Sequence, residues 1–276
     1  MYFADCHTHS KYSYDEIPDV PSSQIEALCE SAIKAGMDEI AVTDHYDVNA
    51  VLESGVKADP AAAGKDINAA KEKYAGRLQV SFGIEIGQAE EYPDHIRDLL
   101  SSVSFDYVLG SLHSLPGKSD LGYYDYTDMS REEIEDLFEE TLGYLMQICD
   151  FSGINAIAHC TFMHRFVKAA GKDIDFGKHY SSIGELFRKM IRTGKSLEVN
   201  TSGLTICRGL TFPSHELVRY YRELGGEMVT CGSDTHGTGG YGVGNGIKST
   251  YAFLQEAGFR YITVFHEGRP VMKKLD

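Results

Sequence analysis

The stretch Tyr2-Phe-Ala-Asp-Cys-His-Thr-His-Ser10 organises the rest of the chain. Its aromatic and small apolar residues from Tyr2 to Cys6 predict a strand that runs into a polar end. Side chains alternate between the two faces of a strand, so His7 and His9 point the same way and could clasp one metal ion. Because a His-x-His pair is also common among exposed or hydrogen-bonded histidines, the metal hypothesis depends on what recurs downstream.

Length, charge and cysteine content favour a single α/β domain that does not bind long nucleic acid. A chain of 276 residues fits one α/β barrel, and we expect a single domain over residues 1–276. The formal charge of −15 disfavours long nucleic acid, whose phosphates are held mainly by Lys and Arg. Six cysteines without a C-x-x-C pair suggest no disulfide framework.

Targeting signals are also absent from the sequence pattern. We see no signal peptide and no apolar run near the ~18 residues of a membrane span. The sequence therefore predicts a cytoplasmic protein without a membrane partner, and it leaves the oligomeric state open.

Apolar segments alternate with helical patterns along the whole chain. We expect strands at 2–6, 39–43, 79–86, 107–112, 156–158, 196–199, 228–231 and 261–265. We expect helices at 21–36, 59–74, 93–100, 130–149, 183–193, 214–224 and 247–257. We expect loops at 46–58, 114–129 and 204–213, and a basic-aromatic loop after His159 that contains His164, Arg165, Phe166 and Lys168. About seven strand–helix units predict parallel strands with crossover helices. An open doubly wound sheet is the competing architecture.

Residues of the metal-ligand type come at the ends of these strands. They are His7, His9, Asp44, His45, Glu85, His113, His159, Asp234 and His236. In a (β/α) barrel these positions share the carboxyl-terminal rim, where active sites lie. One of them alone fits a structural role, whereas the whole set predicts a metal centre. His, Asp and Glu without Cys suit two or three divalent ions of Zn, Mn or Fe, with a carboxylate such as Glu85 bridging two of them.

These residues also carry a resemblance to a known family. The segments are Asp5-Cys-His-Thr-His-Ser10, Thr43-Asp-His45, Gly83-Ile-Glu85, Gly110-Ser-Leu-His113, Ala158-His159 and Gly232-Ser-Asp-Thr-His236. In this order, over residues 2–236, they resemble the motifs of the PHP (polymerase and histidinol phosphatase) superfamily. Glu198-Val-Asn-Thr-Ser-Gly203, with Arg208 after it, is similar to the stand-alone histidinol-phosphate phosphatase branch, and no polymerase module is attached.

The resemblance implies a distorted (β/α)7 TIM-like barrel with a trinuclear metal site at the carboxyl-terminal strand ends. The implied ligands are His7, His9, Glu85 and Asp234 for the first ion, Glu85, His113 and His159 for the second, and Asp15, His45 and His236 for the third. Asp15 departs from family members that have His there, which puts the third ion's occupancy and metal preference in doubt.

The implied activity is metal-dependent phosphomonoester hydrolysis. The expected substrate is L-histidinol phosphate, cleaved to L-histidinol and phosphate in histidine biosynthesis by a metal-bridging hydroxide. Glu85, Asp234 and His236 would serve this chemistry through the metals. Arg165 and Arg208 are candidate phosphate clamps, because a guanidinium binds phosphate bidentately; a surface position would explain either arginine equally well.

Further residues receive weaker assignments. His164 and Lys172 are secondary phosphate candidates, and Asp44 and Asn200 are expected to orient ligands. Asp47, Tyr12 and Phe162 could receive the amine and imidazole of histidinol. The sequence names no general acid for the leaving alcohol.

Three other functions compete with this interpretation. A PHP phosphoesterase acting on nucleotides or other small phosphate esters would use the same chemistry in a different pocket. A metal-dependent deaminase or amidohydrolase also opens with His-x-His, but usually bridges its metals with a modified Lys, whereas Glu85 fills that role here. A binding domain without catalysis would have lost ligands, and none of the motifs lacks one.

Overall fold

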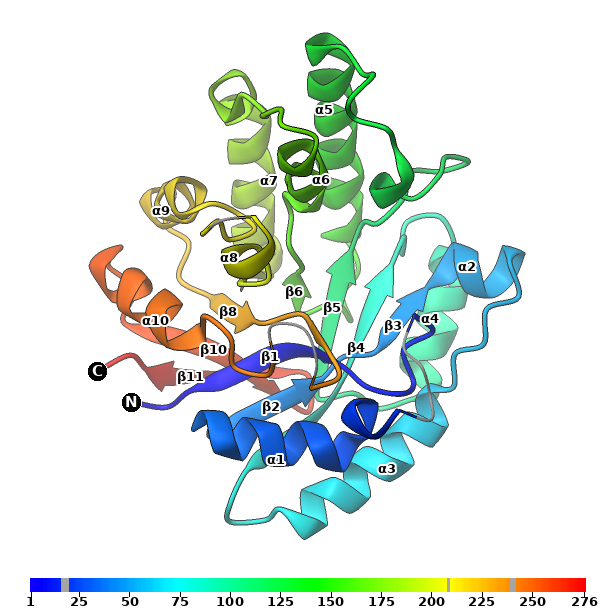
Figure 1. Ribbon diagram of the computed structural model, residues 1–276, viewed down its shortest axis with the longest axis vertical. Coiled ribbons are helices and arrows are strands. Elements are labelled where there is room, and N and C mark those ends of the chain that lie inside the picture. The colour runs from blue at the N-terminus through cyan, green and yellow to red at the C-terminus, as the bar shows by residue number, and fades with distance from the viewer. Residues whose placement is uncertain (16–19, 208, 239–241) are drawn as a thin grey trace.

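A curved, mainly parallel sheet forms the centre of the molecule, as the computed structural model shows for residues 1–15, 20–207, 209–238 and 242–276 (Figure 1). The order of its strands is β8-β7-β6-β5-β4-β2-β1-β9, with β3 also paired to β4. Their bounds are β1 Ala4–His9, β2 Glu39–Val42, β3 His45–Asp47, β4 Gln79–Gly87, β5 Tyr107–Ser111, β6 Ala156–Ile157, β7 Ser196–Asn200, β8 Val229–Gly232 and β9 Thr235–His236. Arg208 lies outside the described residues.

The two ends of this sheet meet. β8 and β9 lie at opposite ends of the strand order, yet they are almost consecutive in the chain. Asp234, whose φ of 55° turns the chain between them, donates its backbone N–H to His7 O at 2.8 Å. A side chain at Gly232 would lie 2.2 Å from His7 Cβ, so only glycine lets β8 approach β1 so closely. The predicted distorted barrel is confirmed, and the open sheet is wrong.

Helices surround the sheet on its outside (Figure 1). They are α1 Ile25–Ala35, α2 Val48–Glu53, α3 Pro60–Lys73, α4 Pro93–Ser102, α5 Arg131–Ile148, α6 Phe162–Ala169, α7 Tyr180–Thr193, α8 Gly203–Ile206, α9 His215–Glu223 and α10 Ile247–Glu256. Local signals define several ends: Ser130 and Glu133 form a capping box on α5, and Gly36 and Gly194 end α1 and α7 in the left-handed conformation. None of the helices in the described part of the chain is long and apolar enough to span a bilayer.

Several segments that we expected to be loops contain short elements. The 46–58 segment holds the end of β3 and α2, the segment after His159 forms α6, and the 204–213 segment includes α8. α6 buries Met163 and Val167, but two turns are too few for a clear helical period in the sequence. The 114–129 segment contains a 3-10 turn at Leu121–Tyr123.

A carboxyl-terminal hairpin closes the amino-terminal end of the barrel. β10 (Tyr261–His266) confirms the last predicted strand, and its antiparallel partner β11 (Arg269–Lys274) was not expected. Val264 and Phe265 are buried with the small residues inside the barrel, and the Phe265 ring stacks on Tyr107 at 5.2 Å. Because this end is plugged, the carboxyl-terminal rim is the open one. A single domain over residues 1–276 stays a prediction.

Candidate active site

Glu85 lies on β4 at the centre of the rim and is fully buried. Its Oε2 atom lies 3.1 Å from His7 Nε2, 2.9 Å from His45 Nδ1 and 3.6 Å from His9 Nε2. The alternation of β1 places both of its histidines on the inner face, where they meet this carboxylate. Contrary to the expected strand at 2–6, His7 and His9 are part of β1 rather than of the loop after it.

The other oxygen of Glu85 faces a second pair of imidazoles. Oε1 lies 2.8 Å from His159 Nε2 and 3.3 Å from His113 Nε2. These histidines follow β6 and β5, the next strands along the sheet. One carboxylate therefore presents one oxygen to each of two histidine groups, which is the arrangement of a bridging ligand.

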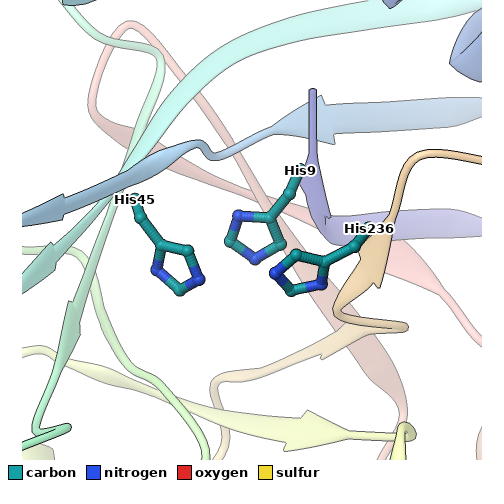
Figure 2. A group of neighbouring side chains, drawn as sticks. All are labelled: His9, His45 and His236. Atoms are coloured by element: carbon teal, nitrogen blue, oxygen red, sulfur yellow. The ribbon is translucent and has the colours of Figure 1, made fainter. Parts of the chain in front are cut away.

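Asp234 and His236 enter the rim beside β1. Thr8 and His9 pair in parallel with Thr235 and His236, and this register sets both acid and imidazole next to His9. Asp234 Oδ1 lies 3.2 Å from His9 Nε2. Figure 2 shows that the rings of His9, His45 and His236 come from three different strands and gather in one place. The His9 ring centroid is 4.2 Å from each of the other two.

Asp15 completes this outer group from the loop after β1. Its Oδ2 atom lies 2.8 Å from His236 Nε2 and 3.6 Å from His45 Nε2. The structure thus brings together the nine residues predicted as metal ligands, which are His7, His9, Asp15, His45, Glu85, His113, His159, Asp234 and His236.

The chemistry of this donor set fits divalent cations. His9 Nε2 lies 3.2 Å from Asp234 Oδ1 and His45 Nδ1 lies 2.9 Å from Glu85 Oε2, but neither buried pair has the geometry of a hydrogen bond. Burial, together with the neighbouring His45 and His236, lowers the pKa of His9 to about 3, which keeps its lone pair free. Burial opposes ionisation of Glu85, but the surrounding imidazoles hold its pKa well below the usual range. Although burial opposes it, the surrounding carboxylates raise the pKa of His7, His45 and His113, so without metal these rings hold protons that a cation would displace. With those protons displaced, the imidazoles and carboxylates suit Zn, Mn or Fe.

A cleft with a volume of about 1170 Å³ opens above the rim. Residues outside the ligand set that line it include Tyr14, Asp120, Tyr123, Phe162, Arg165 and Phe166. Arg165 and Phe162 therefore both lie at the cleft, and a role of Arg165 in binding phosphate stays a prediction. The guanidinium of Arg165 sits over the Phe166 ring, with its carbon 5.6 Å from the ring centroid.

Comparison with known proteins fits this geometry. The sequence profile of the PHP domain matches residues 5–202. The chain belongs to the PHP domain family. Its relatives include the histidinol-phosphatase of Lactococcus lactis subsp. lactis, 25% identical over 236 residues, which cover 84% of this chain and 83% of that protein. They also include a probable histidinol-phosphatase of Thermotoga maritima, 28% identical over 260 residues and 94% of each chain.

Solved structures agree on the PHP fold. The crystal structure of histidinol phosphate phosphatase from L. lactis, complexed with zinc, L-histidinol and phosphate, superposes with a TM-score of 0.82. That comparison covers 98% of each chain at 22% identity. A putative histidinol phosphatase from Listeria monocytogenes gives a TM-score of 0.70 at 22% identity, over 85% of this chain and 95% of that one.

Two acidic residues of this PHP barrel orient histidines and were missed in that role. Glu198 Oε1 lies 2.6 Å from His7 Nδ1, and its Oε2 accepts the backbone N–H of His159 at 2.8 Å. Asp47 Oδ1 lies 2.9 Å from His113 Nδ1. Each carboxylate turns the other ring nitrogen of its histidine toward Glu85. Glu198 lies in the predicted strand that forms β7, and Asp47 ends β3, just after the predicted strand at 39–43. Their closeness to strand ends was the only sign in the sequence that they lie near the rim.

The two residues expected to orient ligands behave differently. Asn200 Nδ2 donates to Asp234 Oδ2 at 3.2 Å, in line with the expectation. Asp44 instead accepts the backbone N–H of Ser10 at 2.5 Å and its hydroxyl at 2.8 Å, which fixes the loop after β1.

Four of the weaker assignments are corrected by their contacts. His164 Nε2 lies 2.7 Å from Asp173 Oδ1, and Lys172 donates to the carbonyl of Thr127 at 2.7 Å. Both are engaged away from the cleft. The hydroxyl of Tyr12 donates to Asp66 at 2.8 Å, and Asp47 is occupied by His113.

Proposed function

We propose that this PHP-domain protein is a metal-dependent phosphomonoesterase that hydrolyses L-histidinol phosphate to L-histidinol and phosphate. The observation that carries the proposal is Glu85, which offers one oxygen to each of two histidine groups at the floor of a cleft lined by Arg165. Relatives named histidinol-phosphatase, and a structural neighbour crystallised with zinc, L-histidinol and phosphate, support the choice of substrate.

The residues at the rim would hold two or three divalent ions. The first set is His7, His9, Glu85 and Asp234, the second is Glu85, His113 and His159, and the third is Asp15, His45 and His236. When bound, such ions lower the pKa of water toward neutrality and offset the charge of a phosphoryl group. Glu85, Asp234 and His236 serve catalysis by holding these ions in place.

Residues of the chain itself bind and orient the ester. Arg165 binds the phosphate oxygens through its planar guanidinium and offsets charge that spreads over them as the ester bond breaks. Glu198 and Asp47 hold His7 and His113 in the orientation that faces the rim. The ring of Phe162, 5.0 Å from both His113 and His159, excludes water from that side of the cleft.

The direct test is a substrate panel with defined metals. The purified protein is depleted of metal, reloaded separately with Zn²⁺, Mn²⁺ or Fe²⁺, and assayed on L-histidinol phosphate, nucleoside monophosphates and simple alkyl phosphates. We expect kcat/KM for L-histidinol phosphate to exceed that for the other esters by at least ~10²-fold. A preference for nucleotides would replace this substrate by the competing one, and no hydrolysis of any ester would reject the phosphatase proposal.

A further inference from the structure

Asp120 is held at a fixed position beside the rim. It forms an antiparallel bridge with Ser114, and the next residue, Leu121, donates its backbone N–H to His113 O at 2.7 Å. These bonds attach the start of the 3-10 turn to the residue that faces Glu85. The Asp120 side chain lines the cleft from this anchored segment.

The Asp120 carboxylate has no cationic side chain of its own. Its Oδ1 atom accepts the backbone N–H of Gly122 at 2.6 Å, and no described Lys or Arg forms an ion pair with it. Burial raises the pKa of Asp120, and nearby Asp47 adds to the effect, while Gly122 and His113 oppose it. A partly buried carboxylate of this kind gains most from a ligand that brings a positive charge.

Gly122 lies between the Asp120 carboxylate and the Phe166 ring, and its lack of a side chain lets the two approach each other. A Cβ at Gly122 would lie 3.0 Å from Asp120 Oδ1 and 3.1 Å from the Phe166 ring. The carboxylate and the aromatic wall are therefore close to each other, separated only by a glycine. The same Phe166 ring supports the guanidinium of Arg165.

The cleft thus combines two unpaired charges of opposite sign. Arg165 lines it without an ion pair to any described carboxylate, and Asp120 lines it without one to any described Lys or Arg. A complementary ligand carries a phosphate for the arginine and a cation for the aspartate. Histidinol phosphate has this pattern, because its ammonium group sits on the carbon next to the one that bears the ester oxygen.

We propose that Asp120 is the specificity-determining residue that binds the ammonium group of the substrate, so that the cleft selects phosphate esters of amino alcohols. The inference rests on the proposed function, since it concerns the same cleft, and it narrows the substrate class. The aromatic side chains Phe162 and Phe166 then face the remainder of the alcohol. Asp47 cannot take this role, because His113 and the Tyr14 hydroxyl already occupy it.

The experiment compares Asp120→Asn with wild type on matched esters. The amide keeps an oxygen to accept the Gly122 N–H but removes the charge. One pair is L-histidinol phosphate and its analogue without the amine; a second is 2-aminoethyl phosphate and ethyl phosphate. We expect kcat/KM to fall about 10- to 100-fold for the amine-bearing ester of each pair, the loss typical of a charge-assisted hydrogen bond. The amine-free esters should react as with wild type.

A matched control and a binding measurement complete the test. Asp128→Asn removes the same charge from an exposed position of the same segment and should change neither rate. Calorimetry with L-histidinol should show weaker binding to Asp120→Asn than to wild type, with no turnover needed. Equal losses on both members of a pair, or unaltered selectivity and histidinol affinity, overturn the proposal. If wild type ignores L-histidinol phosphate yet still prefers 2-aminoethyl phosphate through Asp120, the proposed function fails and this inference stands.

Discussion

The barrel buries a carboxylate at each of its ends, and the two differ in how they are satisfied. At the amino-terminal end, Glu39 accepts hydrogen bonds from the hydroxyls of Tyr2 at 2.9 Å and Ser81 at 2.8 Å. His266 Nε2, from the closing hairpin, lies 3.1 Å from the same carboxylate. Protein donors thus match the acceptors of Glu39, so this end is complete as a piece of structure.

Glu85, at the other end, has no such balance. Its partners are ring nitrogens, and two of the surrounding ones, His9 Nε2 and His45 Nδ1, face carboxylate oxygens without the geometry of a hydrogen bond. So many imidazoles and carboxylates in one buried place need shared protons or cations between them, and these residue types are ligands of divalent metals. The difference indicates that one end of the barrel is built for stability and the other for binding metal.

Removing the metal should give the largest contrast between the two ends, because it should affect activity at the rim and not folding at the base. We expect chelation to abolish phosphate release, because the proposed chemistry depends on the ions at the rim, while the protein stays folded around its plugged base. Elemental analysis of the active protein should give two or three transition-metal ions per chain. The trinuclear proposal is rejected if active protein contains at most one ion.

Charge-neutral replacement of each carboxylate should give the next largest contrast. Glu85→Gln keeps the shape but weakens two metal sites, so we expect at least a ~10²-fold loss of rate. Glu39→Gln should leave the rate close to wild type and lower the free energy of unfolding by about 1–3 kcal/mol, because it disturbs buried hydrogen bonds. Rates and urea unfolding of both variants check this. A folded Glu85→Gln protein with near-normal activity would falsify the bridging role.

The rim was largely predictable from the sequence, because its signals are local. The alternation of β1 puts His7 and His9 on one face, and strand ends deliver Glu85, His113 and His159 to one rim once the strands are parallel. The family motifs supplied the grouping of these ligands. The same logic reproduced the seven main strands and the long helices with clear capping residues.

Contacts between distant segments carried no such signal. Glu198 meets His7 across 191 residues, and neither residue marks the other in a single sequence. β11 was missed because its exposed, charged strand shows no buried alternation, and its role follows only from pairing with β10. Asp120 could not be identified from the sequence, because its candidate role depends on its place in the cleft without a described cationic partner.

Replacing Arg165 should have a smaller effect, on catalysis and phosphate binding at the rim alone. Arg165→Ala should lower kcat/KM for the phosphomonoester by about 10- to 150-fold, because one charge-assisted interaction of roughly 1.5–3 kcal/mol is lost. Inhibition by inorganic phosphate should weaken in parallel, and metal content should stay unchanged. Kinetics, phosphate inhibition and elemental analysis are measured on the same preparation.

The matched control is Arg192→Ala, an exposed arginine in the last turn of α7. It should leave the kinetics and phosphate inhibition as in wild type. Unaltered phosphate inhibition in Arg165→Ala would show that the clamp lies elsewhere. Arg208→Ala, whose position is outside the described residues, is the first alternative to measure in that case.

The smallest expected effect lies at the base and depends on pH. The hydrogen bond to Glu39 raises the pKa of His266 above 6.5, although partial burial opposes it. A raised pKa means that the folded state favours the protonated ring, so this stabilisation is complete below the unfolded pKa of about 6.5 and is lost as the pH rises through the folded value.

His266→Gln should therefore lower the free energy of unfolding by about 0.2–1 kcal/mol at pH 6, as for a partly exposed ion pair, and by almost nothing at pH 9. Urea unfolding of metal-free wild type and variant at both pH values measures this difference, and chelation keeps the histidines of the rim the same in both proteins. A difference that is equal at the two pH values, or larger at pH 9, would mean that His266 holds the hairpin by packing rather than through its charge.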